Sequence, residues 1–156
     1  MRAYGVPAND LDGALPWSWA EQRLTRARNY FVATTRPDGR PHVVAVWGVW
    51  IDDRFCFSSA HESVKSRNLS AEPRCAVAIE SAAESVIMEG DAEQTALDSV
   101  EGMEAAYASK YGPEHIDIIR AGPVWAVRPT IVLGFVEAPA DFSRSATRWR
   151  FSPPRS

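Results

Sequence analysis

The chain has 156 residues, of which 46% are hydrophobic and 24% are charged, with a formal net charge of −3. This length and composition fit one globular domain with its own hydrophobic core. They argue against a nucleic-acid-binding or membrane-spanning protein, because the longest basic stretch is Arg144–Arg150 and no apolar run reaches roughly 18 residues.

Residues 1–14 contain Gly, Asp and Pro and lack the apolar core of a signal peptide. We expect a flexible N-terminal arm over 1–14, a single domain over 15–151 and a tail over 152–156. Cys56 and Cys75 lie in apolar strand contexts without metal-ligand spacing. We expect buried thiols in a cytoplasmic protein, with a disulfide between neighbouring strands as the alternative.

Apolar spacing and turn residues divide the domain into strands and a few helices. Helices are predicted over residues 17–27, 64–71, 97–111 and 114–121. Strands are predicted over residues 30–35, 41–51, 54–59, 74–80, 85–95 and 124–137, with a bulge at Gly90 and an edge position or a bulge at Pro129. Six strands joined mainly by hairpins indicate a mainly β (α+β) fold, a small antiparallel barrel with peripheral helices.

The strand Pro41–Ile51 is apolar on both faces. One face can fill the barrel, and the other must meet another layer, a cofactor or a second subunit. Gly48 interrupts the second face, so a flat ligand or another backbone is expected to come close there.

The segment from Arg54 to Leu69 reads as a strand that runs into a helix capped by Ser63. The first helical turn carries Lys65 and Arg67, and Asn68 follows. Hydroxyls and cations at a helix N-terminus favour an anion, so this segment predicts a phosphate-binding site. The alternative is a solvated basic helix face.

His42, His61 and His115 are scattered and have no carboxylate at a spacing typical of a metal site or a catalytic triad. The sequence therefore shows no acid–base pair. This absence fits an enzyme whose cofactor carries the chemistry while the protein positions it and excludes water.

Four blocks in this order resemble a known superfamily: TTRPDGRPHVVAVWGVW, RFCFSSAHESVKSRNLSAEPRCAV, SVIMEGDAE and ATRWRF. They are similar to the split β-barrel flavin and deazaflavin oxidoreductases, named after pyridoxamine 5′-phosphate oxidase. The resemblance covers about Leu15 to Phe151. The Trp-Ser-Trp helix start and the ATRWRF ending favour the branch that uses coenzyme F420.

The resemblance implies a six-stranded antiparallel split barrel of the FMN-binding type with Greek-key character. It also implies a homodimer with two cofactors at the subunit interface. The residues it implies to bind the cofactor are Val44, Val46, Trp47, Gly48, Phe57, Ser58, Ser59, Lys65, Arg67, Asn68, Ser85, Trp149 and Arg150. Trp149 and Arg150 match C-terminal residues that often reach the cofactor of the other subunit.

Two positions depart from the pattern. Ala45 stands where many relatives have proline, and Val64 stands where the oxidases carry the first residue of an Arg-Lys pair. The residues that hold substrate phosphate in the vitamin-processing oxidases are not recognisable, which argues against pyridoxamine phosphate oxidation. We expect an F420-dependent reductase that transfers hydride to an unsaturated or quinone-like small molecule. An FMN-dependent oxidase or reductase, or a non-catalytic carrier of flavin, F420 or haem, is the alternative.

Overall fold

The computed structural model describes residues 14–138 and 142–152 of the chain. The predicted N-terminal arm and C-terminal tail lie almost entirely outside these residues. The helices are α1 (Trp17–Arg26), α2 (Val64–Ala71), α3 (Met103–Tyr111), α4 (Ile116–Arg120) and α5 (Phe142–Ser145), with 3-10 turns η2 (Leu97–Ser99) and η3 (Pro113–His115). The strands are β1 (Tyr30–Thr35), β2 (Pro41–Val46), β3 (Val49–Ile51), β4 (Arg54–Ser58), β5 (Arg74–Ile79), β6 (Glu84–Thr95), β7 (Val124–Val136) and β8 (Thr147–Arg150).

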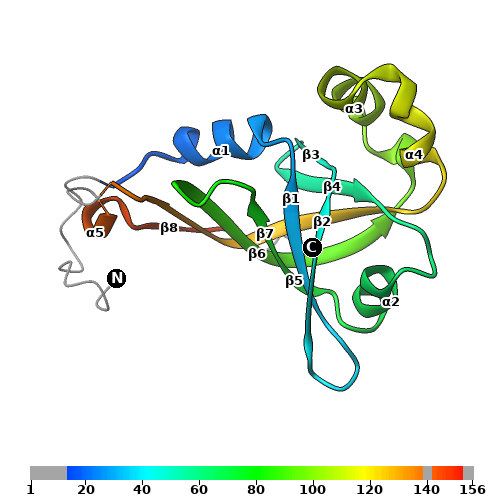
Figure 1. Ribbon diagram of the computed structural model, residues 1–156, viewed down its shortest axis with the longest axis horizontal. Helices are drawn as coiled ribbons and strands as arrows, with labels where there is room; N and C mark the ends of the chain where they lie inside the picture. Colours follow the sequence, from blue (N-terminus) through cyan, green and yellow to red (C-terminus); the bar gives the residue numbers. More distant parts are fainter. Residues whose placement is uncertain (1–13, 139–141, 153–156) are drawn as a thin grey trace.

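The strands form one curled antiparallel sheet in the order β2-β1-β5-β6-β7-β4-β3 (Figure 1). Strand β7 pairs with β6 along its length, with β4 over its first four residues and with β8 over residues 131–134. The predicted mainly β split barrel is confirmed, although the sheet has eight strands rather than six. The two extra strands come from β8 and from the division of the predicted strand 41–51.

That division falls at Trp47 and Gly48, because the two halves pair with different strands. Strand β2 pairs with β1, whereas β3 pairs with β4. A Cβ atom on Gly48 would lie 2.4 Å from the Phe55 ring and 2.8 Å from the Cys56 carbonyl oxygen. Of the two expectations for the gap at Gly48, close approach of another backbone is therefore the one the structure shows, and an aromatic side chain fills the rest.

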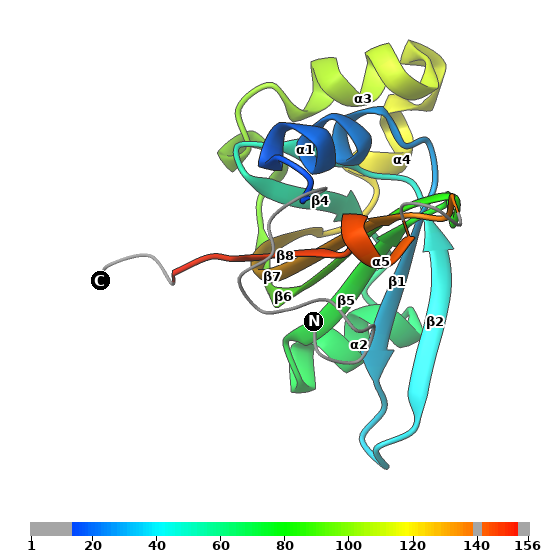
Figure 2. The same ribbon diagram turned by 90° about the vertical axis from the view of Figure 1, so that its left-hand side faces the viewer.

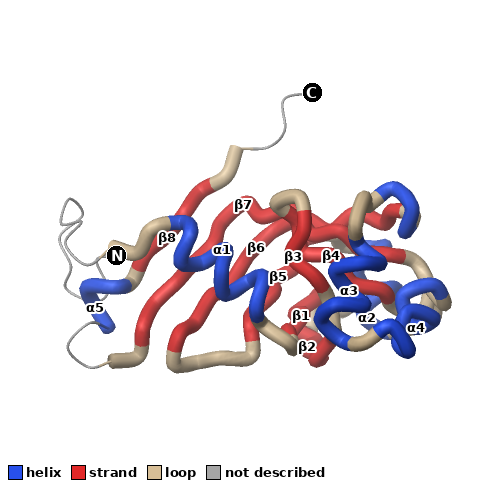
Figure 3. Tube along the Cα trace, turned by 90° about the horizontal axis from the view of Figure 1, so that it is seen from above, coloured by secondary structure: helices blue, strands red, loops and turns tan. Residues whose placement is uncertain are grey.

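Helix α1 lies across the sheet, and α3 and α4 form a second layer near one end of it (Figure 3). The sheet and α1 enclose the barrel core, which includes Leu24, Tyr30, Val32, Phe55, Phe57, Val77, Val86, Met88 and Val132. A second cluster, here called the cap core, lies beneath α3 and α4 and includes Val49, Cys56, Met103, Tyr107, Tyr111 and Ile119. The β1–β2 hairpin extends beyond the rest of the sheet (Figure 2).

Local predictions are confirmed at two places. The Ser63 hydroxyl accepts a hydrogen bond from the Ser66 N–H at 3.2 Å and so caps α2. The β6–β7 register shifts at Gly90, which lies opposite Pro129, and a Cβ atom on Gly90 would lie 2.1 Å from the Arg128 carbonyl oxygen.

The predicted helix over residues 97–111 is wrong in its first half. The chain forms the short turn η2 and then α3, which begins only after Gly102. Gly102 has a φ of +76°, in the left-handed region where a helix cannot continue. The helical periodicity of the sequence extends across this glycine, so periodicity alone predicted one helix.

Cys56 is buried, Cys75 is half-buried, and both are free thiols. Burial raises the pKa of the Cys56 thiol to about 11. Among residues 14–138 and 142–152, no helix has the length and apolar character that a membrane crossing requires.

Candidate functional site

A pocket of about 340 Å³ lies at the open edge of the sheet, where the chain leaves β2. Its walls come from the end of β2, the end of β4, the first turn of α2, and helices α3 and α4. The lining residues are Asn29, Ala45, Val46, Trp47, Ser58, Lys65, Tyr107, Ile118 and Ile119. The pocket therefore combines flat aromatic and aliphatic surface with a few polar groups, as small-molecule sites do.

Lys65 supplies the positive charge of this pocket. It lies in the first turn of α2. The Ser63 side chain caps the N–H of Ser66, and the backbone N–H groups of Val64 and Lys65 have no partner among the described residues. Burial lowers the pKa of Lys65, and no carboxylate of the described ranges lies within ion-pair distance of its ammonium group. A partly buried cation without a counter-charge favours an anionic ligand.

Trp47 forms the aromatic wall, and residues of the cap core hold its ring. The ring stacks on Tyr111 with centroids 4.6 Å apart and planes 12° apart, and His115 lies 5.4 Å away. The Arg28 guanidinium lies 5.7 Å from the Trp47 ring centroid. The indole is therefore fixed before any ligand arrives.

Tyr107 lies on the same pocket wall and is only 1% exposed. Its ring meets Trp47 edge to face at 6.4 Å and Tyr111 at 4.6 Å. Among the described residues, its hydroxyl has no hydrogen-bond partner, and burial raises its pKa. The phenol is therefore a neutral donor near neutral pH.

Of the predicted site residues, the structure brings Val46, Trp47, Ser58 and Lys65 together around this pocket. Val44 lies two residues back along β2, opposite Val32 on the barrel side of the sheet. Gly48 lies directly after Trp47, but its backbone N–H and C=O are already bound by the hydroxyl of Tyr111.

Four further predicted residues lie near the pocket without lining it. Phe57 is fully buried in the barrel core. The Ser59 hydroxyl lies 2.7 Å from that of Ser63, and the Asn68 amide donates to Thr34 Oγ1 at 2.9 Å, so both support α2. Arg67 is exposed on α2 and is not among the residues that line the pocket.

The other three predicted residues lie on parts of the sheet that do not contribute to this pocket. Ser85 is buried on β6 opposite Phe135, and Trp149 packs edge to face on Trp17 at 5.6 Å. Arg150 is exposed on β8 opposite Ile131. Within one chain these residues and the pocket do not meet.

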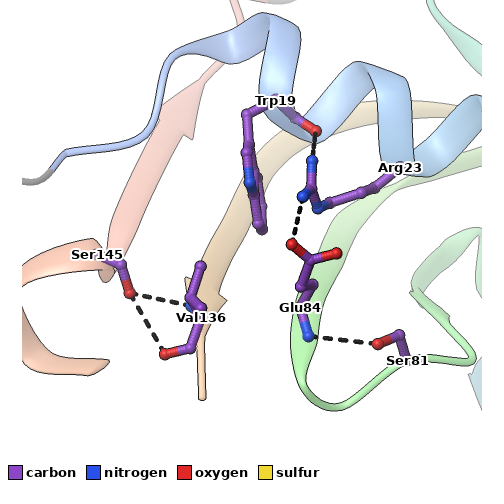
Figure 4. Close-up of polar contacts among 6 residues, drawn as sticks. All are labelled: Trp19, Arg23, Ser81, Glu84, Val136 and Ser145. Atoms are coloured by element: carbon purple, nitrogen blue, oxygen red, sulfur yellow. Dashed lines mark hydrogen bonds and ion pairs between the residues drawn. The ribbon is translucent and has the colours of Figure 1, made fainter. Parts of the chain in front are cut away.

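Polar contacts fix this region of the sheet (Figure 4). The Arg23 guanidinium donates to the Trp19 carbonyl at 3.1 Å and to the Glu84 carboxylate, and it lies 3.9 Å over the Trp19 ring. The Ser145 hydroxyl accepts from the Val136 N–H at 2.9 Å and so ties α5 to the end of β7. Strand β8, with Trp149 and Arg150, is thereby held in place on β7.

Sequence reasoning missed the lining residues Asn29, Tyr107, Ile118 and Ile119. Tyr107 lies on the buried side of α3, but nothing in the sequence aims that side at β2. The pair Tyr107 and Tyr111, one helical turn apart, was the available signal. The described residues contain no cluster of three His, Cys, Asp or Glu side chains that could hold a metal ion.

A curled antiparallel sheet with this pocket at its open edge defines a split β-barrel protein of the flavin and deazaflavin oxidoreductase superfamily. The family model described as pyridoxamine 5′-phosphate oxidase matches residues 20–136, and the chain belongs to that family. The resemblance drawn from the four sequence blocks is thereby confirmed. No curated protein sequence matches the chain significantly.

Solved structures share the fold. An F420 reductase is 25% identical with a TM-score of 0.58, and the match covers 72% of this chain and 94% of that one. A haem-binding protein from Mycobacterium smegmatis is 20% identical with a TM-score of 0.70, over 87% of this chain and 59% of that one. A conserved hypothetical protein from Mycobacterium tuberculosis is 21% identical with a TM-score of 0.68, over 76% and 82%. The fold is thus shared by proteins with different named ligands.

Proposed function

We propose that this protein is an F420-dependent reductase, which transfers hydride from the reduced deazaflavin to an unsaturated or quinone-like small molecule. The observation that carries the proposal is Lys65, a cation without an ion-pair partner among the described residues, in one pocket with the flat Trp47 ring. An anion clamp and a flat wall are what a cofactor with a phosphate and a fused ring system requires. The named F420 reductase with the same fold supports the choice of cofactor.

The residues present fit such a cofactor. Lys65 and the free N–H groups of α2 would hold its phosphate, and Ser58 adds a hydroxyl. Trp47, Ile118 and Ile119 would cover its ring and exclude water. The reduced cofactor supplies the hydride, so the protein's part is to bind, orient and shield.

We further propose that the protein acts as a homodimer formed through the outer face of the sheet. One row of paired residues on this face runs across five strands: Ala45, Phe31, Ala78, Ile87 and Leu133. Phe31 is 45% and Val43 60% exposed, the two most exposed large apolar residues of β1 and β2. Such a continuous apolar surface favours association. In the dimer, Ser85, Trp149, Arg150 and Arg67 are proposed to complete the partner's site.

A cytoplasmic location is proposed as well, supported by the two free thiols.

The second candidate is a non-catalytic carrier of flavin, F420 or haem. It is favoured by the pocket lining, which holds no carboxylate, imidazole or thiol that could exchange a proton with a substrate. The haem-binding protein with the same fold supports the haem variant of this candidate.

Two measurements test the proposal. Titration of the purified protein with F420, FMN and haem compares the three ligands directly. Stopped-flow mixing of the complex of protein and reduced F420 with menadione, without oxygen, follows reoxidation of the cofactor. Saturable reoxidation faster than that of free cofactor supports a reductase. Tight binding without acceleration would identify a carrier, and preferred FMN binding would move the protein to the flavin-dependent alternative.

A further inference from the structure

Tyr107 carries an almost buried hydroxyl group that the fold does not use. The residue is 1% exposed, yet no described residue accepts from or donates to its oxygen. A buried polar group without a partner is unfavourable, so such groups are rarely left unpaired in native proteins. Its neighbour Tyr111 shows the usual outcome, because the hydroxyl of Tyr111 binds backbone groups of Gly48 and Arg28.

Tyr107 is one of the residues that line the pocket. Among the described residues, only Arg23 and Arg54 have a side-chain nitrogen or oxygen that is both fully sealed and unpartnered. The Tyr107 oxygen therefore keeps an opening, and its side chain borders the pocket together with Trp47 and Lys65. The rings of Trp47 and Tyr111 pack on the Tyr107 ring and fix its position.

We propose that Tyr107 is a ligand-contacting residue, whose hydroxyl donates a hydrogen bond to an acceptor atom of the flat ring system bound in the pocket. The inference rests on the proposed function, because the ring systems in question are those of F420 and FMN. Both carry carbonyl oxygens and ring nitrogens that accept hydrogen bonds. Burial raises the pKa of the phenol, so it remains protonated and able to donate through the neutral range.

This arrangement also defines the class of ligand. Lys65 favours an anionic group, and Tyr107 favours a ring with an acceptor atom at its edge. An apolar ring without acceptors would leave the phenol unpaired and lose affinity. The pocket is therefore expected to prefer heteroaromatic anions over aromatic hydrocarbons of equal size.

The test compares Tyr107→Phe with the parent and with Tyr111→Phe, a matched control that loses the same atom from the same helix. FMN and F420 are titrated into each protein, the visible absorption band of each complex is recorded, and the thermal midpoint of each empty protein is measured. We expect Tyr107→Phe to lose roughly three- to tenfold in affinity for the bound cofactor, with a shifted absorption band. Its empty form should melt at or above the temperature of the parent, whereas Tyr111→Phe should melt lower.

Each other outcome overturns the inference. Parental affinity and an unshifted band in Tyr107→Phe would mean that the hydroxyl contacts only water. A melting temperature lowered as in Tyr111→Phe would mean that the hydroxyl has a structural partner. If the parent binds neither FMN nor F420, the proposed function itself fails and this inference fails with it. If the parent binds FMN or F420 and Tyr107→Phe binds it with the same affinity, only the role of Tyr107 is refuted.

Discussion

The hydroxyl of Tyr111 binds both backbone polar groups of Gly48. Its oxygen lies 2.9 Å from the Gly48 nitrogen, which donates to it, and 2.8 Å from the Gly48 carbonyl oxygen. The Arg28 carbonyl oxygen lies 2.7 Å away, so the single phenolic proton has two acceptors. One side chain of the cap core thus satisfies the backbone where β2 ends and Trp47 turns toward the pocket.

Tyr111→Phe is predicted to lower the free energy of unfolding by about 1–3 kcal/mol, because the buried Gly48 N–H loses its partner. Urea denaturation of the parent and the variant measures the change. The matched control is Tyr107→Phe, whose hydroxyl has no partner among the described residues and whose loss should leave stability unchanged. Equal stability of the parent and Tyr111→Phe would contradict this role.

The sequence predicts most of the sheet because its strands alternate clearly and its turns carry specific residues. Tyr30–Thr35 and the helix Val64–Ala71 have the predicted bounds, since both lie between strong breakers. The break at Trp47 and Gly48 could not be predicted, because the local pattern stays strand-like across it. It is set by partners distant in sequence, β1 for one half and β4 for the other.

Lys65→Ala is predicted to weaken F420 or FMN binding roughly ten- to a hundredfold, because a charge-assisted contact contributes about 1.5–3 kcal/mol. The melting temperature of the empty protein should barely change, since the lysine has no ion-pair partner among the described residues. Isothermal titration at two salt concentrations measures both the loss and its screening, and the loss should be smaller at high salt.

Arg67→Ala is the companion variant. Arg67 is exposed and does not line the pocket of its own chain. If the affinity of this variant equals that of the parent, Arg67 is only a solvated cation. If the affinity falls, Arg67 contributes to the site in the dimer. Unchanged affinity in Lys65→Ala would show that α2 is only a solvated face.

Gly48→Val is predicted to destabilise the fold, although valine suits a strand. The new Cβ atom would lie 2.4 Å from the Phe55 ring and 2.8 Å from a backbone oxygen that cannot move freely. Overpacking of this kind costs typically 1–3 kcal/mol or more. Chemical unfolding measures the change, and a variant as stable as the parent would show that the barrel core near Phe55 is loosely packed.

Lys110 is predicted to make stability depend on pH in the alkaline range. Its ammonium group donates to the Ala27 carbonyl at 2.9 Å and to the Tyr30 hydroxyl at 2.8 Å. Burial lowers its pKa to about 8, against the attraction of Glu80. As the pH rises, the folded protein therefore releases this proton before the unfolded chain does. The free energy of unfolding must then rise with pH between the lowered pKa of Lys110 in the folded protein and the ordinary lysine pKa in the unfolded chain.

The variant for this test is Lys110→Met, which removes the titrating amine. The free energy of unfolding of the parent, minus that of the variant, should increase from about pH 7 to about pH 10. Tyr30 and Tyr111 face the same amine, but their pKa values are raised above the ordinary tyrosine value. The parent and the variant both contain these tyrosines, so their titration largely cancels in the difference. A difference that stays constant across this range would mean that the amine is not buried as described.

Phe31→Glu is predicted to turn the proposed dimer into a monomer at micromolar concentration, because a charge would be buried in the apolar outer face of the sheet. Sedimentation velocity measures the state. The matched control is Ala105→Glu, which places the same charge on an exposed position of α3. A parent that sediments as a monomer would refute the dimer, and a dimeric Phe31→Glu would move the interface elsewhere.

The site was predictable where it depends on local chain features. Ser63, Lys65 and the N-terminus of α2 follow from capping and charge within a few residues. Tyr107 and Ile118 were not predictable as lining residues, because their approach to β2 depends on how a whole helical connection folds back over the sheet. Trp149 and Arg150 lie on β8, away from the pocket of their own chain, and a contact with the cofactor requires the proposed second copy of the chain.

Thr95 and Val124 are direct neighbours on the ladder between β6 and β7. Everything between them, including α3 and α4, is thus one excursion that leaves and rejoins the sheet at the same point. The connection supplies Tyr107, Ile118 and Ile119 to the pocket and no strand to the barrel. Selection can therefore rewrite the pocket-facing positions of this wall without disturbing the strand register, provided that Tyr111 keeps its bonds to Gly48.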